Sequence, residues 1–312
     1  MMAGGSRWNT QIDGPAMKIV LLIAGIFVLY QLAVLLVMMM GWRNPRAPHR
    51  RDPGSLGFGF EPVRFPTAGG KALYGWWIPC GEADAPVLIL MHGWGRNVER
   101  MLPYVAMLHP AGFDLLAFDA RHHGSSDGDT FASMPKFSED IRAAVDEVAK
   151  HRHPAPKAVG VLGLSVGGSA AIHASAHDPR IAVVATVGAF ANPRDPRATL
   201  GRFWWILAPG LPLAFRFVEW RIGVRFLAIA PENVIAESRA RFLLIHGTAD
   251  TVVPVAHARR LASAAGTAAR VWILPGRGHS DTHFEGGMGK TLAGFFRQAL
   301  VSSPNPAAEG IP

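Results

Sequence analysis

Five residues around Ser165 form the pattern Gly-x-Ser-x-Gly, which can present a serine hydroxyl as a nucleophile. The pattern follows an apolar run at Val159–Leu164 and precedes small residues at 168–174, so a strand, a sharp turn and a helix are expected in that order. Glycine is needed on both sides of the serine because a side chain would clash in so tight a turn. A serine that only caps a helix is the alternative, and the preceding strand favours the nucleophile.

A serine hydroxyl needs a general base, and histidine suits this role because its unperturbed pKa of ~6.5 lies near neutral pH. The chain has 13 histidines. His279 is the best candidate because it lies in a glycine-rich turn directly after the apolar run Val271–Leu274. His283 is the nearest rival, but it lies further into the following segment.

The third candidate is Asp250, a carboxylate that would hold the base in one tautomer. It follows the apolar run Phe242–His246, and residues after buried parallel strands gather at the carboxyl edge of a sheet, where Ser165 is also expected. Asp281 and Glu285 are alternatives, but both follow the histidine in the chain. The order serine, carboxylate, histidine is the order found in one large class of hydrolytic enzymes.

Backbone N–H groups beside the nucleophile are needed to stabilise the negatively charged oxygen of a tetrahedral intermediate. Val166 follows the nucleophile at the expected helix start and supplies one donor. The second is expected from His92-Gly93-Trp94-Gly95, after the apolar run Val87–Met91, where two glycines allow a close approach of the backbone. The N–H of Trp94 is the candidate, and His92 is expected to support this loop.

A series of apolar stretches predicts the sheet that positions these residues. Val63–Phe65 and Ala72–Ile78 flank glycine-containing turn residues, which predicts a hairpin. The later stretches alternate with amphipathic segments such as Pro135–His151, a pattern typical of a mostly parallel sheet with helices on both faces. These later stretches are Val87–Met91, Leu115–Phe118, Val159–Leu164, Ile181–Val187, Phe242–His246 and Val271–Leu274.

Residues 193–231 interrupt this alternation and predict a helical cap inserted over the carboxyl edge of the sheet. The segment is rich in aromatic residues, arginine and proline, and it is longer than the dozen or so residues that a crossover needs. A buried pair of crossover helices is the alternative. The apolar residues of the cap are expected to line a cleft for an acyl chain or an aromatic group, unless they only hold the cap together or touch a bilayer. They are Phe203, Trp204, Trp205, Leu207, Phe215, Phe217 and Trp220.

An uncharged run at residues 19–40 predicts a single membrane-spanning helix. At ~1.5 Å per residue the run covers about 33 Å, enough to cross a hydrocarbon core of ~30 Å. A cleaved signal peptide is the rival, but its apolar core is ~7–15 residues long and a small-x-small site should follow. Arginines at 43, 46, 50 and 51 follow the run, so the positive-inside rule places the body in the cytoplasm. Lys18, directly before the run, favours the opposite orientation.

The remaining sequence predicts one large domain with two appendages. The predicted parts are a tail and anchor at 1–43, a linker at 44–59, an α/β domain with its cap at 60–303, and a disordered tail at 304–312. The chain of 312 residues is long enough for one such domain. Its net charge of +8 is spread along the sequence without a nucleic-acid-binding motif, so anionic lipid head groups are favoured as partners over nucleic acid.

These motifs together resemble the α/β-hydrolase superfamily over about residues 60–300. They are most similar to the prolyl-oligopeptidase-like and serine-aminopeptidase-like hydrolases, which include bacterial members with an N-terminal membrane segment. The resemblance implies that the serine, carboxylate and histidine form a catalytic triad beside the two oxyanion donors, with no metal or organic cofactor. The motifs are His92–Gly95, Asp119–Ser126 (a structural loop in the family), Gly163–Gly167, His246–Asp250 and Gly278–His279.

The expected activity is cleavage of a carboxylic ester or thioester bond in a hydrophobic small molecule or lipid, through an acyl-enzyme. A peptidase or aminopeptidase-like amide hydrolase is the first alternative. A membrane-tethered binding protein without catalytic activity is the second, although no member of the triad is missing from the sequence.

Overall fold

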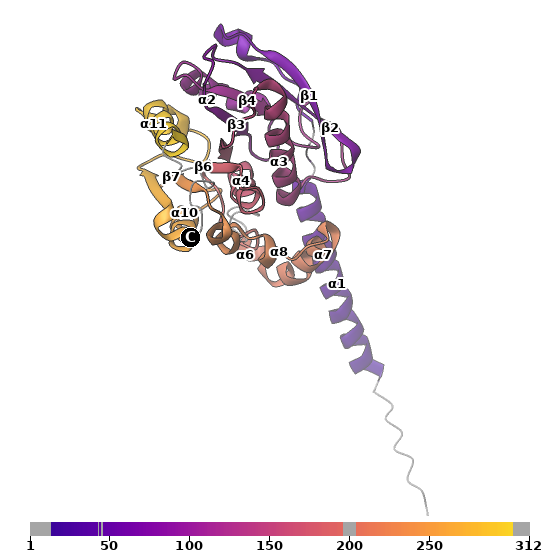
Figure 1. Cartoon of the computed structure of the whole chain (residues 1–312). Coiled ribbons are helices and arrows are strands. Elements are labelled where there is room, and N and C mark those ends of the chain that lie inside the picture. Colours follow the sequence, from indigo (N-terminus) through magenta and orange to yellow (C-terminus); the bar gives the residue numbers. More distant parts are fainter. Residues whose placement is uncertain (1–13, 43, 45, 196–203, 302–312) are drawn as a thin grey trace, which may run out of the picture.

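A mostly parallel sheet of eight strands forms the centre of the protein (Figure 1). The computed structural model describes residues 14–42, 44, 46–195 and 204–301. Strand β2 is antiparallel to its neighbours β1 and β4, and all other neighbouring strands are parallel. The strands, in the spatial order β1-β2-β4-β3-β5-β6-β7-β8, are β1 (Glu61–Thr67), β2 (Lys71–Ile78), β3 (Val87–Met91), β4 (Asp114–Phe118), β5 (Val159–Leu164), β6 (Ile181–Val187), β7 (Arg241–Gly247) and β8 (Ala269–Leu274). The predicted hairpin, parallel sheet and strand positions are therefore confirmed.

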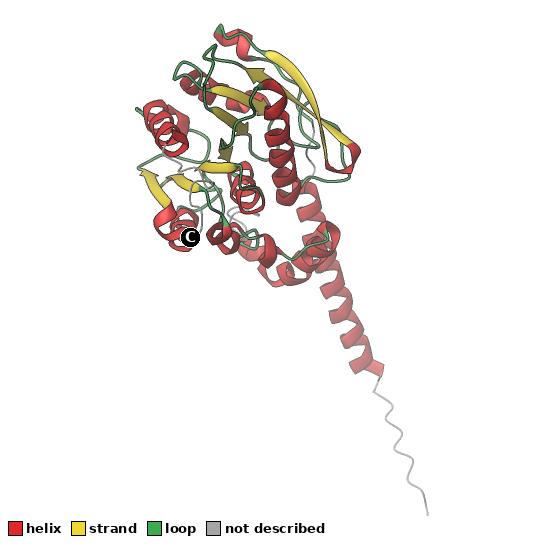
Figure 2. Cartoon of the chain, in the orientation of Figure 1, coloured by secondary structure: helices red, strands yellow, loops and turns green. Residues whose placement is uncertain are grey.

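Helices cover both faces of the sheet (Figure 2). Helices α3, α4 and α10 pack in the core on one face, and α2 and α11 pack in the core on the other. The helices are α1 (Gly14–Trp42), α2 (Leu102–Leu108), α3 (Met134–His151), α4 (Val166–His177), α6 (Trp204–Leu207), α7 (Leu211–Ile222), α8 (Phe226–Ile229), α9 (Pro231–Val234), α10 (Ala256–Ala265) and α11 (Met288–Val301).

Strand β3 shows why the central strands are apolar at every position. All five of its residues are buried. Val87, Ile89 and Met91 join the core on the side of α3 and α4, while Leu88 and Leu90 join the core on the side of α2 and α11. Because successive side chains of a strand point to opposite faces, a strand covered on both faces must be apolar throughout.

The predicted cap segment forms a group of short helices, α6 to α9, between β6 and β7. One buried charge of the cap, on Glu219, is satisfied within the cap. The buried carboxylate of Glu219 accepts a hydrogen bond from the Phe226 N–H (2.9 Å) and pairs with Arg194 (2.7 Å), which ties α7 to α8. Residues 196–203 of the predicted cap lie outside the described residues, as does the predicted tail at 304–312.

Helix α1 leaves the body as a long rod (Figure 1) and is long and apolar enough to cross a membrane. The segment predicted as a linker follows it, and this segment lies against the body. His49 Nε2 lies 2.8 Å from Asp119 Oδ2, and Asn97 Nδ2 donates to the backbone oxygen of Ala47 (3.2 Å). Asn44 and Pro53 are buried. The end of α1 is therefore held in a defined position relative to the sheet.

Candidate active site

Ser165 occupies a sharp turn between β5 and α4, with the uncommon backbone angles φ 51° and ψ −121°. Its two flanking glycines are sterically required. A Cβ at Gly163 would lie 2.4 Å from the Gly167 carbonyl oxygen, and a Cβ at Gly167 would lie 2.4 Å from the His92 carbonyl oxygen. A non-glycine residue held at positive φ signals a functional constraint on the backbone. The strand, turn and helix predicted around Ser165 are present.

His279 and Asp250 lie side by side, although 28 residues separate them in the chain. His279 Nδ1 lies 2.7 Å from Asp250 Oδ2. The other carboxylate oxygen of Asp250 accepts hydrogen bonds from the N–H groups of Val252 (2.9 Å) and Val253 (2.8 Å). Burial raises the pKa of Asp250, but hydrogen bonds with His246 and His279 outweigh burial and hold that pKa below its ordinary value. Asp250 therefore stays ionised and holds the proton of His279 on Nδ1.

His246 is a second partner of this carboxylate, to which the sequence analysis assigned no role. It is 1% exposed, and its Nε2 lies 2.7 Å from the Val253 carbonyl oxygen and 3.3 Å from Asp250 Oδ2. The imidazole thus braces both the carboxylate and the turn that follows it. Its position at the end of β7, four residues before the acid, is the sequence signal that could have identified it.

The rival candidates make other contacts. Asp281 Oδ1 accepts a hydrogen bond from the Gly278 N–H (2.6 Å), and Glu285 pairs with Arg277 (2.9 Å). The His283 ring lies 4.1 Å from the Phe284 ring. Within the described part of the chain, Asp250 is the carboxylate with which His279 pairs. Among the described residues, no cluster of His, Cys, Asp or Glu has the arrangement of a metal site.

The two predicted oxyanion donors flank the serine. Val166 is the first residue of α4, where N–H groups have no partner within the helix. The loop that carries Trp94 approaches closely, since a Cβ at Gly93 would lie 3.3 Å from Ser165 Cβ. His92 is buried and holds this loop: its Nδ1 donates to the Gly93 oxygen (2.7 Å), and its Nε2 accepts from the Ala120 N–H (3.0 Å). Burial lowers the pKa of His92, which keeps the ring neutral for these bonds.

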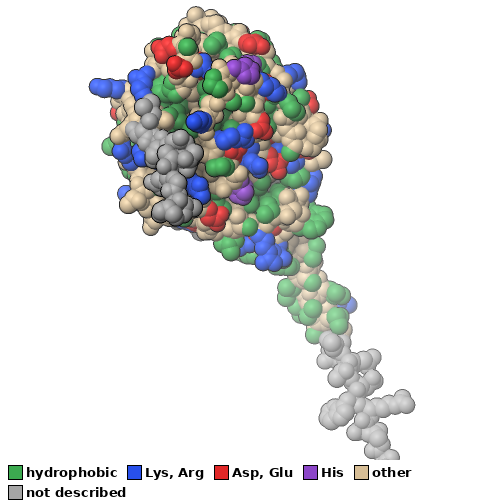
Figure 3. Space-filling model, viewed as in Figure 1, with side chains coloured by type: hydrophobic (Ala, Val, Ile, Leu, Met, Phe, Trp, Pro, Cys, Tyr) green, Lys and Arg blue, Asp and Glu red, His purple; other side chains and the backbone are tan. Residues whose placement is uncertain are grey.

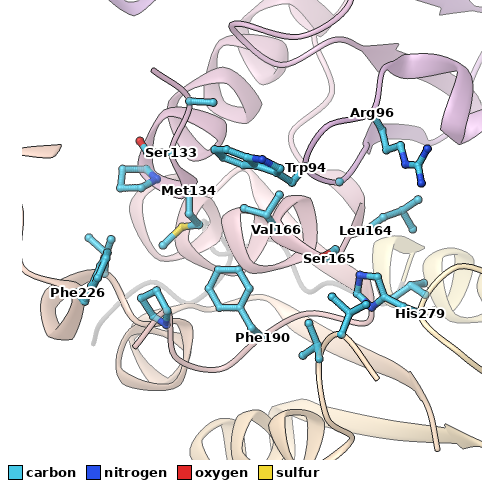
Figure 4. A pocket seen from close by; sticks show the side chains of 18 of the residues that line it. Trp94, Arg96, Ser133, Met134, Leu164, Ser165, Val166, Phe190, Phe226 and His279 are labelled. Carbon is cyan, nitrogen blue, oxygen red and sulfur yellow. The ribbon is translucent and has the colours of Figure 1, made fainter. Parts of the chain in front are cut away.

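Ser165 and His279 line the same cavity, which has a volume of about 770 Å³. Figure 4 shows the two side chains near one end of this cavity, with Phe226 and Met134 toward the other. The volume lies in the range of ~300–1,000 Å³ that is typical of small-molecule sites. One pocket at the carboxyl edge of the sheet therefore holds Ser165, His279 and the two candidate N–H donors. Asp250 lies behind the histidine.

Comparison with known proteins agrees with this arrangement. A family model described as serine aminopeptidase, S33, matches residues 82–218. The esterase Pf2001 of Pyrococcus furiosus has the same fold, with a TM-score of 0.66 at 21% identity, over 83% of this chain and 99% of the esterase. The chain therefore has the α/β-hydrolase fold.

Two relatives of this α/β hydrolase illustrate the similarity in sequence. YfhR of Escherichia coli K12, a protein described as uncharacterized, is 29% identical over 237 residues, or 74% of this chain and 75% of YfhR. The thiohydrolase aneE of Aspergillus aculeatus is 31% identical over 131 residues, which is 41% of each chain.

The cap of this α/β hydrolase contributes a different set of residues to the cavity from the one predicted. Leu207 and Phe215 line the cavity as expected, but Trp205 and Trp220 are 64% and 74% exposed. Phe217 packs against Trp220, with 5.6 Å between ring centroids, and does not line the cavity. The prediction is wrong for these three residues because it counted aromatic residues without assigning them to a face of a helix. Phe203 and the Trp204 side chain lie outside the described residues. The cap residues that the prediction missed are Pro193, Val218, Ile222, Phe226 and Ile229.

Proposed function

We propose that this α/β hydrolase is a serine esterase that cleaves carboxylic ester or thioester bonds of hydrophobic substrates through Ser165, His279 and Asp250. The observation that carries the proposal is the 2.7 Å contact between His279 Nδ1 and Asp250 Oδ2. The same histidine lines a cavity together with Ser165, which lies in a strained turn. A base held by an ionised acid beside an exposed hydroxyl is the arrangement that nucleophilic catalysis requires.

The proposed reaction has two halves. Ser165 Oγ attacks the carbonyl carbon and gives its proton to His279 Nε2, while the N–H groups of Trp94 and Val166 bind the negatively charged oxygen. The intermediate collapses, the bond to the leaving alcohol or thiol breaks, and that group takes the proton from His279. Water then attacks the acyl-enzyme with His279 again as the base, and releases the carboxylic acid and free Ser165.

The lining of the cavity favours a hydrophobic ester over an amino-terminal peptide. An aminopeptidase has to bind the positively charged terminal ammonium of its substrate, for which a carboxylate is the usual partner. The described lining residues include Arg96 and Arg100 but no Asp or Glu, and most of the others are apolar. The esterase Pf2001 and the thiohydrolase aneE bear names that agree with ester or thioester cleavage.

A fluorophosphonate probe and a series of p-nitrophenyl esters test this proposal on the full chain in detergent. The probe should label the wild type, and Ser165→Ala should remove the label; Ser169→Ala, a serine one turn further along α4, is the matched control and should keep it. Hydrolysis should be faster for octanoate than for acetate and slow for an aminoacyl p-nitroanilide. A folded wild type that takes no label would support a binding protein instead, and a preference for the anilide would support a peptidase.

We further propose that α1 spans a membrane once and that the catalytic body lies on the cytoplasmic side. The support is the length and apolar character of α1 and the arginines that follow it. Protease treatment of sealed inside-out membrane vesicles should digest the body, and digestion of right-side-out vesicles should leave it intact. The reverse pattern would place the body on the other side.

A further inference from the structure

One stripe of α1 packs against the cap. Val34 and Met38 are buried, and the Tyr30 hydroxyl donates a hydrogen bond to the Ile206 carbonyl oxygen (2.9 Å). Gly210 allows this close approach, because a Cβ at that position would lie 2.7 Å from Val34 Cγ2. The cap is therefore fixed along the C-terminal half of the helix.

The free part of α1 is too short to cross a bilayer. Residues 14–29 are all exposed, and these 16 residues cover only about 24 Å at ~1.5 Å per residue. The hydrocarbon core is ~30 Å thick, so about 6 Å of the span must come from the part that packs against the cap. If the apolar run at 19–40 alone forms the span, the part from Tyr30 onward supplies about 16 Å of it. If α1 spans the bilayer as proposed above, the cap extends into the membrane beside it in both arrangements.

The outer surface of the cap has the composition that such a position requires. Outside α1, eight large apolar side chains are exposed among the described residues, and five of them belong to the cap: Trp205, Ile206, Leu213, Trp220 and Leu227. Leu213, Phe217 and Trp220 recur at helical spacing on one side of α7, with Arg216 between them. Figure 3 shows apolar and basic side chains together where α1 leaves the body. Aromatic residues beside arginines are typical of the boundary between lipid tails and head groups.

Helix α1 also forms part of the wall of the catalytic cavity. Val37 and Met38 line it together with Leu207, Phe215 and Val218 of the cap. Val37 keeps 46% of its surface exposed, so the cavity reaches the surface of α1 that would face lipid. The apolar end of the cavity and the membrane-facing side of the cap thus meet at the same helix.

We propose that the cap is embedded in the leaflet next to the body, and that the cavity opens sideways into this leaflet between α1 and the cap. The substrate is then a membrane-resident lipid ester or thioester, whose acyl chain reaches Ser165 without crossing water. The substrate class rests on the esterase function proposed above, whereas the position of the cap rests only on the proposed membrane span of α1.

The depth of the cap is measured with fluorescent labels in the full chain, reconstituted in phosphatidylcholine vesicles that contain doxyl-labelled lipid. Cys80→Ser removes the single native cysteine, and Leu213→Cys or Leu227→Cys then carries an NBD label. Both labels should lose fluorescence to the doxyl groups. Val271→Cys, an exposed apolar position on edge strand β8, is the matched control and should lose none. Unquenched labels at both cap positions would overturn the proposal, and cross-linking of those positions between two chains would show that a second copy covers the face instead.

The path of the substrate is tested by narrowing the cavity at α1. Val37→Trp should lower the ratio of the hydrolysis rate of a long-chain fluorogenic ester in vesicles to that of p-nitrophenyl acetate, by about tenfold. Leu36→Trp adds the same bulk to the adjacent, 60% exposed position and should leave the ratio unchanged. Equal ratios in the two variants would contradict lateral entry. If the wild type hydrolyses no ester while both cap labels are quenched, the esterase function fails and the embedded cap stands.

Discussion

The two ends of the cavity that Ser165 and Met38 line are built on different physical principles. At the end near Ser165, short hydrogen bonds fix each group: His279 to Asp250 at 2.7 Å, and Asp250 to two backbone N–H groups. At the end near α1, the wall consists of apolar side chains from the cap and from α1, such as Phe215 and Met38. In the proposed reaction, the directional contacts determine which bond is attacked, and the non-directional apolar contacts determine which molecules enter. We therefore expect substitutions near Ser165 to abolish activity, and substitutions near α1 to change which substrates are accepted.

The most severe change on the hydrogen-bonded end is Asp250→Asn. The substitution preserves size but no longer holds the His279 proton on Nδ1, so kcat should fall by roughly 10⁴. Steady-state hydrolysis of p-nitrophenyl octanoate by the full chain measures the effect, and circular dichroism checks the fold. A loss of less than tenfold would move the role of the acid to another carboxylate.

A substitution on the apolar end should change selectivity more than chemistry. Ile222 is half-buried and lines the cavity, so Ile222→Trp should shorten the cavity and lower the ratio of octanoate to acetate hydrolysis by about tenfold. Leu213→Trp adds the same side chain to the exposed side of the same helix and should keep the ratio. An unchanged ratio in Ile222→Trp would show that acyl chains do not occupy this end.

The segment that follows α1 and carries His49 should make a pH-dependent contribution to the stability of the fold. The hydrogen bond with Asp119 raises the pKa of His49, and the same contact keeps the pKa of Asp119 low although burial raises it. The pair therefore stabilises the fold most below the ordinary histidine pKa of ~6.5, and this contribution is lost as pH rises through the raised value. His49→Gln should lower the unfolding free energy by about 0.5 kcal/mol at pH 5.5 and by less at pH 9, because His49 is partly exposed and screened.

Thermal unfolding of the full chain in detergent at the two pH values measures this effect. Asn97→Ala removes an uncharged contact to the same segment, the hydrogen bond from Asn97 to the Ala47 carbonyl oxygen. Its effect on Tm should be the same at both pH values. A His49→Gln effect that is larger at pH 9 would contradict the proposed charge on this histidine.

The smallest effect is expected from Arg96, an exposed residue at the polar end of the cavity. Arg96→Gln should reduce kcat/KM by about twofold to fivefold for an ester with a carboxylate-bearing leaving group, as expected for a screened surface charge. A neutral ester of the same chain length should react as before. Arg270→Gln, on edge strand β8, is the control and should affect neither substrate.

The elements and the candidate chemistry of this protein could be predicted from its residues. The Gly-x-Ser-x-Gly turn has local requirements: a Cβ at Gly163 or at Gly167 would come within 2.4 Å of backbone oxygen. The strands were predictable because their burial on both faces makes them continuously apolar. Asp250 and His279 could be proposed because each follows such a strand, and parallel strands deliver their following residues to the same edge.

Which side chains meet could be seen only in the folded chain. The role of His246 depends on a turn that brings Val253 and Asp250 to its Nε2, and hydropathy carries no sign of that contact. The cap was predicted as a segment, but Trp205, Phe217 and Trp220 lie outside the cavity because the face that a helix buries is set by its neighbours. The packing of α1 against Gly210 joins residues about 180 positions apart. Contacts at that separation depend on the path of the whole chain, which no local pattern of residues encodes.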